Sequence, residues 1–149
     1  MNTPILYFAY GSNLNPKRIR HRCPTAVTFR AAKLRHYKIV ERLYADIDFE
    51  LNGIVSGVLY CISERDLQTL DTYEGCPRIY RRIWVEVECE GETYLAATYQ
   101  MTAETIVLRA GMPYPEDYRR ICSNGANYHH IPNNFISRKL FFKLKRSSK

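Results

Sequence analysis

The sequence predicts one α+β domain whose sheet is small and strongly curved or barrel-like. Apolar strand-like segments follow one another with only short turns between them, and the few segments with helical periodicity are short. The chain has 149 residues, 46% of them hydrophobic and 25% charged, which is ordinary for a globular protein with its own core. We expect residues 1–132 to form the domain and residues 133–149 to add a C-terminal helix and a basic tail.

The first elements are a strand over residues 4–10, a tight loop and a short helix over residues 15–22. Asn15 suits the N-cap of that helix and Pro16 its first position, where a missing N–H costs nothing. The Gly-Ser-Asn loop of residues 11–13 therefore presents free backbone N–H groups at a helix start, a geometry that binds anions and oxyanions. The alternative is an ordinary strand-to-helix turn, since Gly-Ser-Asn alone is a weak signal.

Further strands are predicted at residues 26–34, 37–40, 54–62, 79–89 and 93–100. Residues 44–53 are rich in acids, Asn and Gly, so they predict an exposed loop or hairpin end. Gly57 lies inside a strand and indicates a bulge or a close backbone approach. Glu90-Gly91 is typical of a hairpin turn. The C-terminal third predicts helices at 115–123 and near 133–142.

A capped helix is predicted between the strands at 54–62 and 79–89. Ser63 suits its N-cap, and Asp66 completes a capping-box pattern three residues later. Gly75 suits the position just beyond the C-terminus. The helix is therefore expected to end at about Glu74.

Glu74 shares one face of this helix with Leu67 and Leu70, because the three are spaced i, i+3 and i+7. Burial and the helix macrodipole both disfavour its charge, so we expect its pKa above the reference value of about 4.3. Such a carboxyl group can move protons near neutral pH. The alternative is a structural salt bridge with a following arginine, namely Arg78, Arg81 or Arg82. Asp71 points to another face, which we expect to be wet.

The five cysteines and four histidines have no spacing typical of a metal site. We expect the cysteines to be buried free thiols in a reducing compartment, and His129 and His130 to lie at the surface. The sequence has neither a nucleotide-binding glycine loop nor a Gly-x-Ser-x-Gly elbow. Any chemistry is therefore expected to use no metal and no cofactor, only a carboxyl group and backbone donors.

The net charge of +7 is concentrated at the two ends, with nine Lys/Arg against one acid in residues 1–42 and six against none in residues 138–149. Such ends could bind nucleic acid or an anionic membrane, although runs of this kind are more often solvated faces and a frayed tail. No apolar run approaches the roughly 20 residues of a membrane span, and no signal-peptide pattern opens the chain. We therefore expect a cytoplasmic protein that does not bind a membrane. Nucleic-acid binding through the basic ends is kept as an alternative function.

Several segments together carry a resemblance to a known family. They are the string Tyr-Phe-Ala-Tyr-Gly-Ser-Asn-Leu at residues 7–14, the strand at 57–60, the helix end at 70–75, Tyr80, and residues 115–126. The first string is highly specific, and the order covers nearly the whole domain. The chain resembles the γ-glutamylcyclotransferase-like (AIG2-like) family.

The resemblance implies an α+β fold with a small barrel and a cavity beside the 11–13 loop. By matching position it makes Glu74 the catalytic acid/base. It places around a small γ-glutamyl substrate the residues Tyr7, Tyr10, Gly11, Ser12, Asn13, Tyr80 and Tyr118.

The reaction that the family carries out fits these groups, because the substrate's own α-amine attacks its γ-carbonyl carbon to give 5-oxoproline and expel an amine. One carboxyl group can shuttle the protons, and backbone N–H groups can stabilise the oxyanion. The leaving amine stays open, since the family acts on γ-glutamyl amino acids, glutathione, γ-glutamyl amines and carrier-linked groups. A non-catalytic binding module on the same fold is the main alternative.

Overall fold

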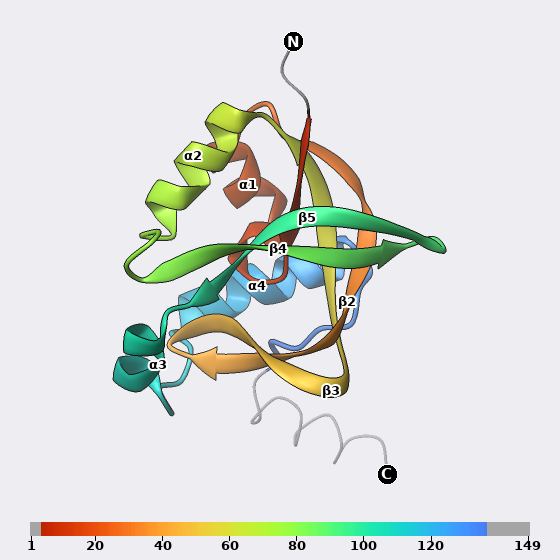
Figure 1. Cartoon of the computed structure of the whole chain (residues 1–149). Helices are drawn as coiled ribbons and strands as arrows, with labels where there is room; N and C mark the ends of the chain where they lie inside the picture. Colours follow the sequence, from red (N-terminus) through yellow and green to blue (C-terminus); the bar gives the residue numbers. More distant parts are fainter. Residues whose placement is uncertain (1–3, 137–149) are drawn as a thin grey trace.

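The structure is a computed structural model that describes residues 4–136 of the chain. Figure 1 shows five strands wound into a barrel with short helices around it, which confirms the predicted α+β class and barrel-like sheet. Of the helix predicted near 133–142, residues 133–136 are not helical. The remainder of that segment and the basic tail lie outside the described residues.

The strands are β1 (Ile5–Ala9), β2 (Val27–Arg42), β3 (Tyr44–Ile62), β4 (Tyr80–Cys89) and β5 (Glu92–Met101). They form a closed barrel in the order β1-β3-β2-β4-β5. The β2–β3 and β4–β5 pairs are antiparallel hairpins, and a parallel pairing of β1 with β5 at Tyr7 and Ala97 completes the ring. Phe8, Val58 and Leu59 are fully buried in the core, so the packed interior holds β1 against β3.

Residues 44–53 are the first part of β3, and the prediction of an exposed loop or hairpin end was wrong. The side chain of Asp46 is fully buried there, between Ala45 and Ile47. Its carboxylate is paired with Arg42 at 2.7 Å and accepts the Met101 N–H at 2.9 Å. The buried charge is tolerated because Arg42, at the end of the neighbouring strand β2, and Met101, at the end of β5, supply these partners.

The remaining strand predictions are largely confirmed. The segments predicted at 26–34 and 37–40 join into the single strand β2, with a register shift where His36 adopts a φ of 67°. Glu90 and Gly91 have φ values of 50° and 80°, as a two-residue hairpin turn requires. A Cβ atom on Gly57 would lie 2.3 Å from the Ala9 carbonyl oxygen, so the close backbone approach is confirmed.

The helices are α1 (Pro16–Arg22), α2 (Glu64–Tyr73), α3 (Ala103–Arg109) and α4 (Glu116–Tyr128), with a 3-10 turn at Ser12–Leu14. Asn15 caps α1 by accepting the Lys17 N–H at 3.0 Å, and Ser63 and Asp66 form the predicted capping box of α2. The predicted helix at 115–123 continues to Tyr128, and α3 was not predicted. Figure 1 shows α1 and α2 on one side of the β4–β5 hairpin and α3 on the other.

All five cysteines are free thiols. Cys23, Cys89 and Cys122 are buried as predicted, whereas Cys61 and Cys76 are half-buried. Among the helices of residues 4–136, none combines the length and the apolar character that crossing a membrane requires.

Candidate active site

A cavity of about 290 Å³ lies between the 11–13 loop and the C-terminal end of α2. The cavity wall includes all eight residues that the sequence singled out, namely Tyr7, Tyr10, Gly11, Ser12, Asn13, Glu74, Tyr80 and Tyr118. These residues come from β1, the loop that follows it, α2, β4 and α4. The fold therefore brings them into one place from across most of the chain.

The 11–13 loop has the backbone geometry of an anion site. The carbonyl groups of Gly11 and Ser12 accept the N–H groups of Leu14 and Asn15 at 3.1 and 3.0 Å, which makes the tight 3-10 turn. The N–H groups of Gly11, Ser12 and Asn13 themselves donate to no protein acceptor within residues 4–136. Because these donors are already fixed in direction, they can receive a developing negative charge without rearrangement.

The loop is held rigidly through the side chain and carbonyl of Asn13, which is buried. Its amide donates to the Tyr7 hydroxyl at 2.9 Å and accepts from Arg22 at 3.1 Å. Its carbonyl oxygen accepts from the Tyr60 hydroxyl at 2.8 Å. His129 supports the same loop, with Nε2 3.0 Å from the Leu14 carbonyl oxygen. It is half-buried and not at the open surface as predicted, whereas His130 is exposed as predicted.

Glu74 is the C-cap residue of α2, and its N–H donates to the Leu70 carbonyl at 2.9 Å. Leu67 and Leu70 are buried on the same face, as the spacing predicts, and this directs Glu74 to the cavity. Its side chain keeps 20% of its surface exposed, and it lies 4.0 Å from a guanidinium nitrogen of Arg22. Desolvation raises the pKa of Glu74 to about 7, although the positive charges of Arg22 and Arg18 oppose this rise.

The arginines that follow Glu74 in sequence do not pair with it. Arg82 instead pairs with Asp71 at 2.8 Å. The Tyr99 hydroxyl donates to the other carboxylate oxygen of Asp71 at 2.6 Å. Asp71 therefore has both oxygens engaged. It lies on another face than Glu74, as predicted, but that face is only partly exposed and not open to water as expected.

Three tyrosines of the cavity, Tyr10, Tyr80 and Tyr118, have their hydroxyls hydrogen-bonded to the backbone. Tyr10 donates to the Tyr99 carbonyl at 2.5 Å, and Tyr80 donates to the Ala45 carbonyl at 2.9 Å. The Tyr118 hydroxyl accepts the Ala45 N–H at 3.0 Å. Burial raises the pKa of Tyr10, Tyr80 and Tyr118 above the ordinary phenol value, so these side chains stay neutral. These three tyrosines therefore line the cavity as neutral side chains, whereas Glu74 has a pKa near neutrality.

Several other residues line the cavity that sequence reasoning missed, notably Arg18, Arg22, Tyr44, Tyr99 and Arg109. Arg18 and Arg22 had a usable signal, since they are four residues apart on the helix that follows the loop and so share its face. Tyr99 and Arg109 had no such sequence signal, because only the tertiary fold brings them to the loop. Within residues 4–136, no group of three or more His, Cys, Asp or Glu side chains is placed to hold a metal ion.

Comparison with known proteins gives three findings. A family model described as "Gamma-glutamyl cyclotransferase, AIG2-like" matches residues 7–121. Proteins named gamma-glutamylcyclotransferase from Bos taurus and Mus musculus are similar to this chain. The bovine protein is 33% identical over 141 residues, covering 85% of this chain and 72% of its own length. The mouse protein is 31% identical over 144 residues, covering 87% and 74%.

A solved structure titled "Gamma-glutamyl cyclotransferase" has the same fold. It superposes with a TM-score of 0.74 at 24% identity, and the match covers 97% of this chain and 99% of that one. The likeness therefore extends over the whole barrel and its helices, including the elements that form the cavity.

Proposed function

Since this chain belongs to the gamma-glutamyl cyclotransferase, AIG2-like family, we propose that it cyclises a γ-glutamyl group to 5-oxoproline and releases an amine or amino acid, with Glu74 as acid/base. The observation that supports the role of Glu74 is its position. A carboxyl group with a pKa of about 7 lines the same cavity as the free N–H groups of the 11–13 loop. These are the two kinds of group that an intramolecular aminolysis needs from a protein.

The nucleophile in this reaction belongs to the substrate. Glu74 removes a proton from the α-ammonium group, and the freed nitrogen attacks the γ-carbonyl carbon to close a five-membered ring. The carbonyl oxygen becomes an oxyanion that the N–H groups of the 11–13 loop stabilise, where one donor is worth about 3 kcal/mol. The bond to the leaving nitrogen then breaks, and Glu74 returns the proton to that nitrogen.

The charge of the cavity supports an anionic substrate. Arg18, Arg22 and Arg109 line it against the single acid Glu74. A γ-glutamyl compound carries an α-carboxylate, and a γ-glutamyl peptide carries a second one. We further propose that the reaction takes place in the cytoplasm, because five free cysteines are typical of a reducing compartment. The three arginines make small γ-glutamyl peptides, glutathione among them, candidate substrates.

The test is 5-oxoproline release from γ-glutamyl-alanine, glutathione and γ-glutamyl-ε-lysine by the wild type and by Glu74→Gln. We expect turnover of at least one class, and a loss of kcat in the variant of roughly 10²- to 10⁴-fold. Glu86→Gln, an exposed acid on β4, is the matched control and is expected to keep full activity. A folded wild type that turns over no member of the panel would contradict the proposal and favour a non-catalytic binding module.

A further inference from the structure

The cavity wall contains a third arginine besides Arg18 and Arg22. Arg109, in the last turn of α3, lines the same cavity as Glu74 and the 11–13 loop. Both charges act on Tyr80, since Glu74 raises the pKa of its phenol and Arg109 lowers it. Figure 1 shows α3 and the α1–α2 pair on opposite sides of the β4–β5 hairpin. The cavity therefore has cationic side chains from two separate elements, Arg18 and Arg22 from α1 and Arg109 from α3.

Among the described residues, Arg109 has no partner of opposite charge. Its Nη1 atom is buried and makes no hydrogen bond, and no carboxylate within residues 4–136 forms an ion pair with it. Its guanidinium lies over the Tyr44 ring, 5.2 Å from the centroid. Arg22, by contrast, donates to Asn13 and lies beside Glu74. A desolvated guanidinium nitrogen with no acceptor is costly, and this cost is removed when a ligand supplies the acceptor.

The tyrosines trace the path from the reaction centre to Arg109. The Tyr118 hydroxyl is 3.1 Å from where a Cβ atom on Gly11 would lie, so it packs directly against the loop. The Tyr118 ring contacts the Tyr44 ring edge-to-face, with centroids 4.8 Å apart. The Arg109 guanidinium in turn lies over the Tyr44 ring. Gly11, Tyr118, Tyr44 and Arg109 thus form a continuous series of contacts along the cavity wall, from the loop to a cationic side chain.

We propose that Arg109 binds the carboxylate of the leaving amino acid and so makes this enzyme select γ-glutamyl amino acids over γ-glutamyl amines. The inference rests on the proposed function, because it assumes that the γ-glutamyl group lies between Glu74 and the loop. The planar guanidinium fork matches a carboxylate in two hydrogen bonds, a match that a simple amine leaving group cannot offer. Among the described residues, Glu74 is the only acid in the cavity wall, so the wall as a whole favours an anionic group.

The experiment compares γ-glutamyl-alanine with γ-glutamyl-ethylamide, which lacks only the carboxylate of the leaving group. We expect the wild type to favour γ-glutamyl-alanine in kcat/KM by at least tenfold, as a charge-assisted hydrogen bond would give. Arg109→Gln should lower kcat/KM for γ-glutamyl-alanine roughly 10- to 100-fold and leave the ethylamide within about threefold. The kcat/KM of Arg109→Lys for γ-glutamyl-alanine should lie between the values of the wild type and Arg109→Gln, because lysine keeps the charge but lacks the planar guanidinium.

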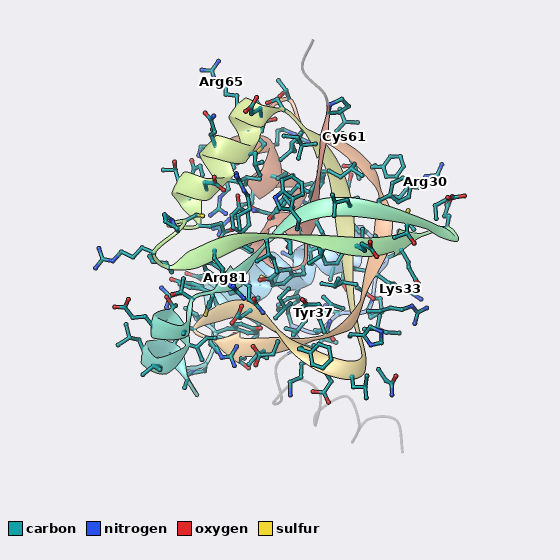
Figure 2. All side chains as sticks on the ribbon, viewed as in Figure 1. Arg30, Lys33, Tyr37, Cys61, Arg65 and Arg81 are labelled. Carbon is teal, nitrogen blue, oxygen red and sulfur yellow. The ribbon has the colours of Figure 1, made fainter. Side chains whose placement is uncertain are left out.

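The ratio of the two substrates is measured on one protein preparation, so a loss of folded protein in a variant cancels from it. Arg65→Gln is the control, since Figure 2 shows Arg65 on α2 pointing away from the barrel, and its ratio should equal that of the wild type. Turnover of both substrates with an unchanged ratio in Arg109→Gln would overturn the role of Arg109 alone. Turnover of neither substrate by the wild type would overturn the proposed function and this inference together.

Discussion

Glu74 is held in a place that does not favour its charge. The buried residues Leu67 and Leu70 direct it inward, and desolvation raises its pKa to about 7 in spite of Arg22. A functional carboxyl group of this kind lowers the stability of the fold at neutral pH, because the native state must ionise a group that burial keeps protonated. The same feature that suits proton transfer is therefore measurable as a cost in stability.

We predict that Glu74→Gln stabilises the protein at alkaline pH. The native carboxyl keeps its proton to about pH 7, against an ordinary value of 4.5, so its contribution to stability is complete below about pH 4.5 and is lost as the pH rises through 7. A glutamine side chain does not ionise, so the stability of the variant does not fall with pH at this position. The variant should match the wild type near pH 4.5 and exceed it by at most about 3 kcal/mol above pH 7. Urea denaturation at pH 5 and pH 8 measures this, and a variant less stable at pH 8 would mean that Glu74 is a structural ion-pair partner.

Arg22 and Arg18 should set the pH at which the enzyme becomes active. Both lower the pKa of Glu74, Arg22 more than Arg18. Because the base must be ionised, kcat/KM should rise with pH through about 7 in the wild type. In Arg22→Met the rise should move to higher pH, and in Arg18→Met it should move less. The substrate amine is common to all three profiles, so an unchanged or acid-shifted profile would contradict the assignment.

These residues also mark how far the sequence could predict the site. Glu74 could be predicted because helical spacing relates it to Leu67 and Leu70 within eight residues of chain. Arg109 could not, since a missing ion pair is a tertiary property and nothing near Arg109 in sequence indicates it. The partner of Glu74 was misjudged for the same reason, because Arg22 is far away in sequence and Arg82 is near.

At the level of elements, α4 supports the loop that carries the anion site. A Cβ atom on Gly125 would lie 2.5 Å from the Asn15 nitrogen and 2.5 Å from the Leu14 carbonyl carbon. Both are backbone atoms that cannot rotate away. The helix can pack this closely against the 11–15 segment only because residue 125 has no side chain.

We predict that Gly125→Ala destabilises the protein although it improves helix propensity. The substitution favours an isolated helix by about 1 kcal/mol. Displacing α4 from the loop should outweigh this gain and lower the free energy of unfolding by about 1–3 kcal/mol in total. The loop donors then move, so kcat for 5-oxoproline release should fall as well. Urea denaturation and the activity assay check both effects. Asn124→Ala, an exposed neighbour on α4, should be neutral or slightly stabilising, and the same result for Gly125→Ala would contradict the close packing.

Elements with strong local signals were predicted well, and those that depend on distant partners were not. The capping box at Ser63 and the turn at Glu90-Gly91 are local, and both are present. The acidic segment 44–53 becomes a strand because Arg42 and Met101 satisfy Asp46 from other strands. The short helix α3 escaped prediction, since seven residues give little periodicity to detect.

At the scale of the molecule, barrel closure creates the cavity. The pairing of β1 with β5 at Tyr7 and Ala97 brings the start of the chain beside residues some ninety positions later. The 11–13 loop that follows β1 shares its cavity with the end of α2 and with Arg109 of α3. Composition and hairpin spacing indicated a curved sheet, but the order β1-β3-β2-β4-β5 depends on pairings between distant strands, which no local pattern specifies.

The charge of the whole chain should make substrate capture depend on ionic strength. The sequence carries a net charge of +7, and three arginines face one acid in the cavity. γ-Glutamyl-alanine has two carboxylates and one ammonium group, so it is a net anion, whereas γ-glutamyl-ethylamide is net neutral. The positive field should attract the first and leave the second largely unaffected.

We therefore predict that raising the ionic strength from 0.01 to 0.15 M raises KM for γ-glutamyl-alanine roughly two- to fivefold, because the screening length falls from about 30 to about 8 Å. KM for the ethylamide should stay nearly constant, and kcat for both should hold, since the chemical step takes place inside the cavity where salt screens little. Steady-state kinetics at a series of NaCl concentrations measures this. An equal salt effect on both substrates would show that salt perturbs the protein itself, and no effect on either would show that the arginines act only at short range.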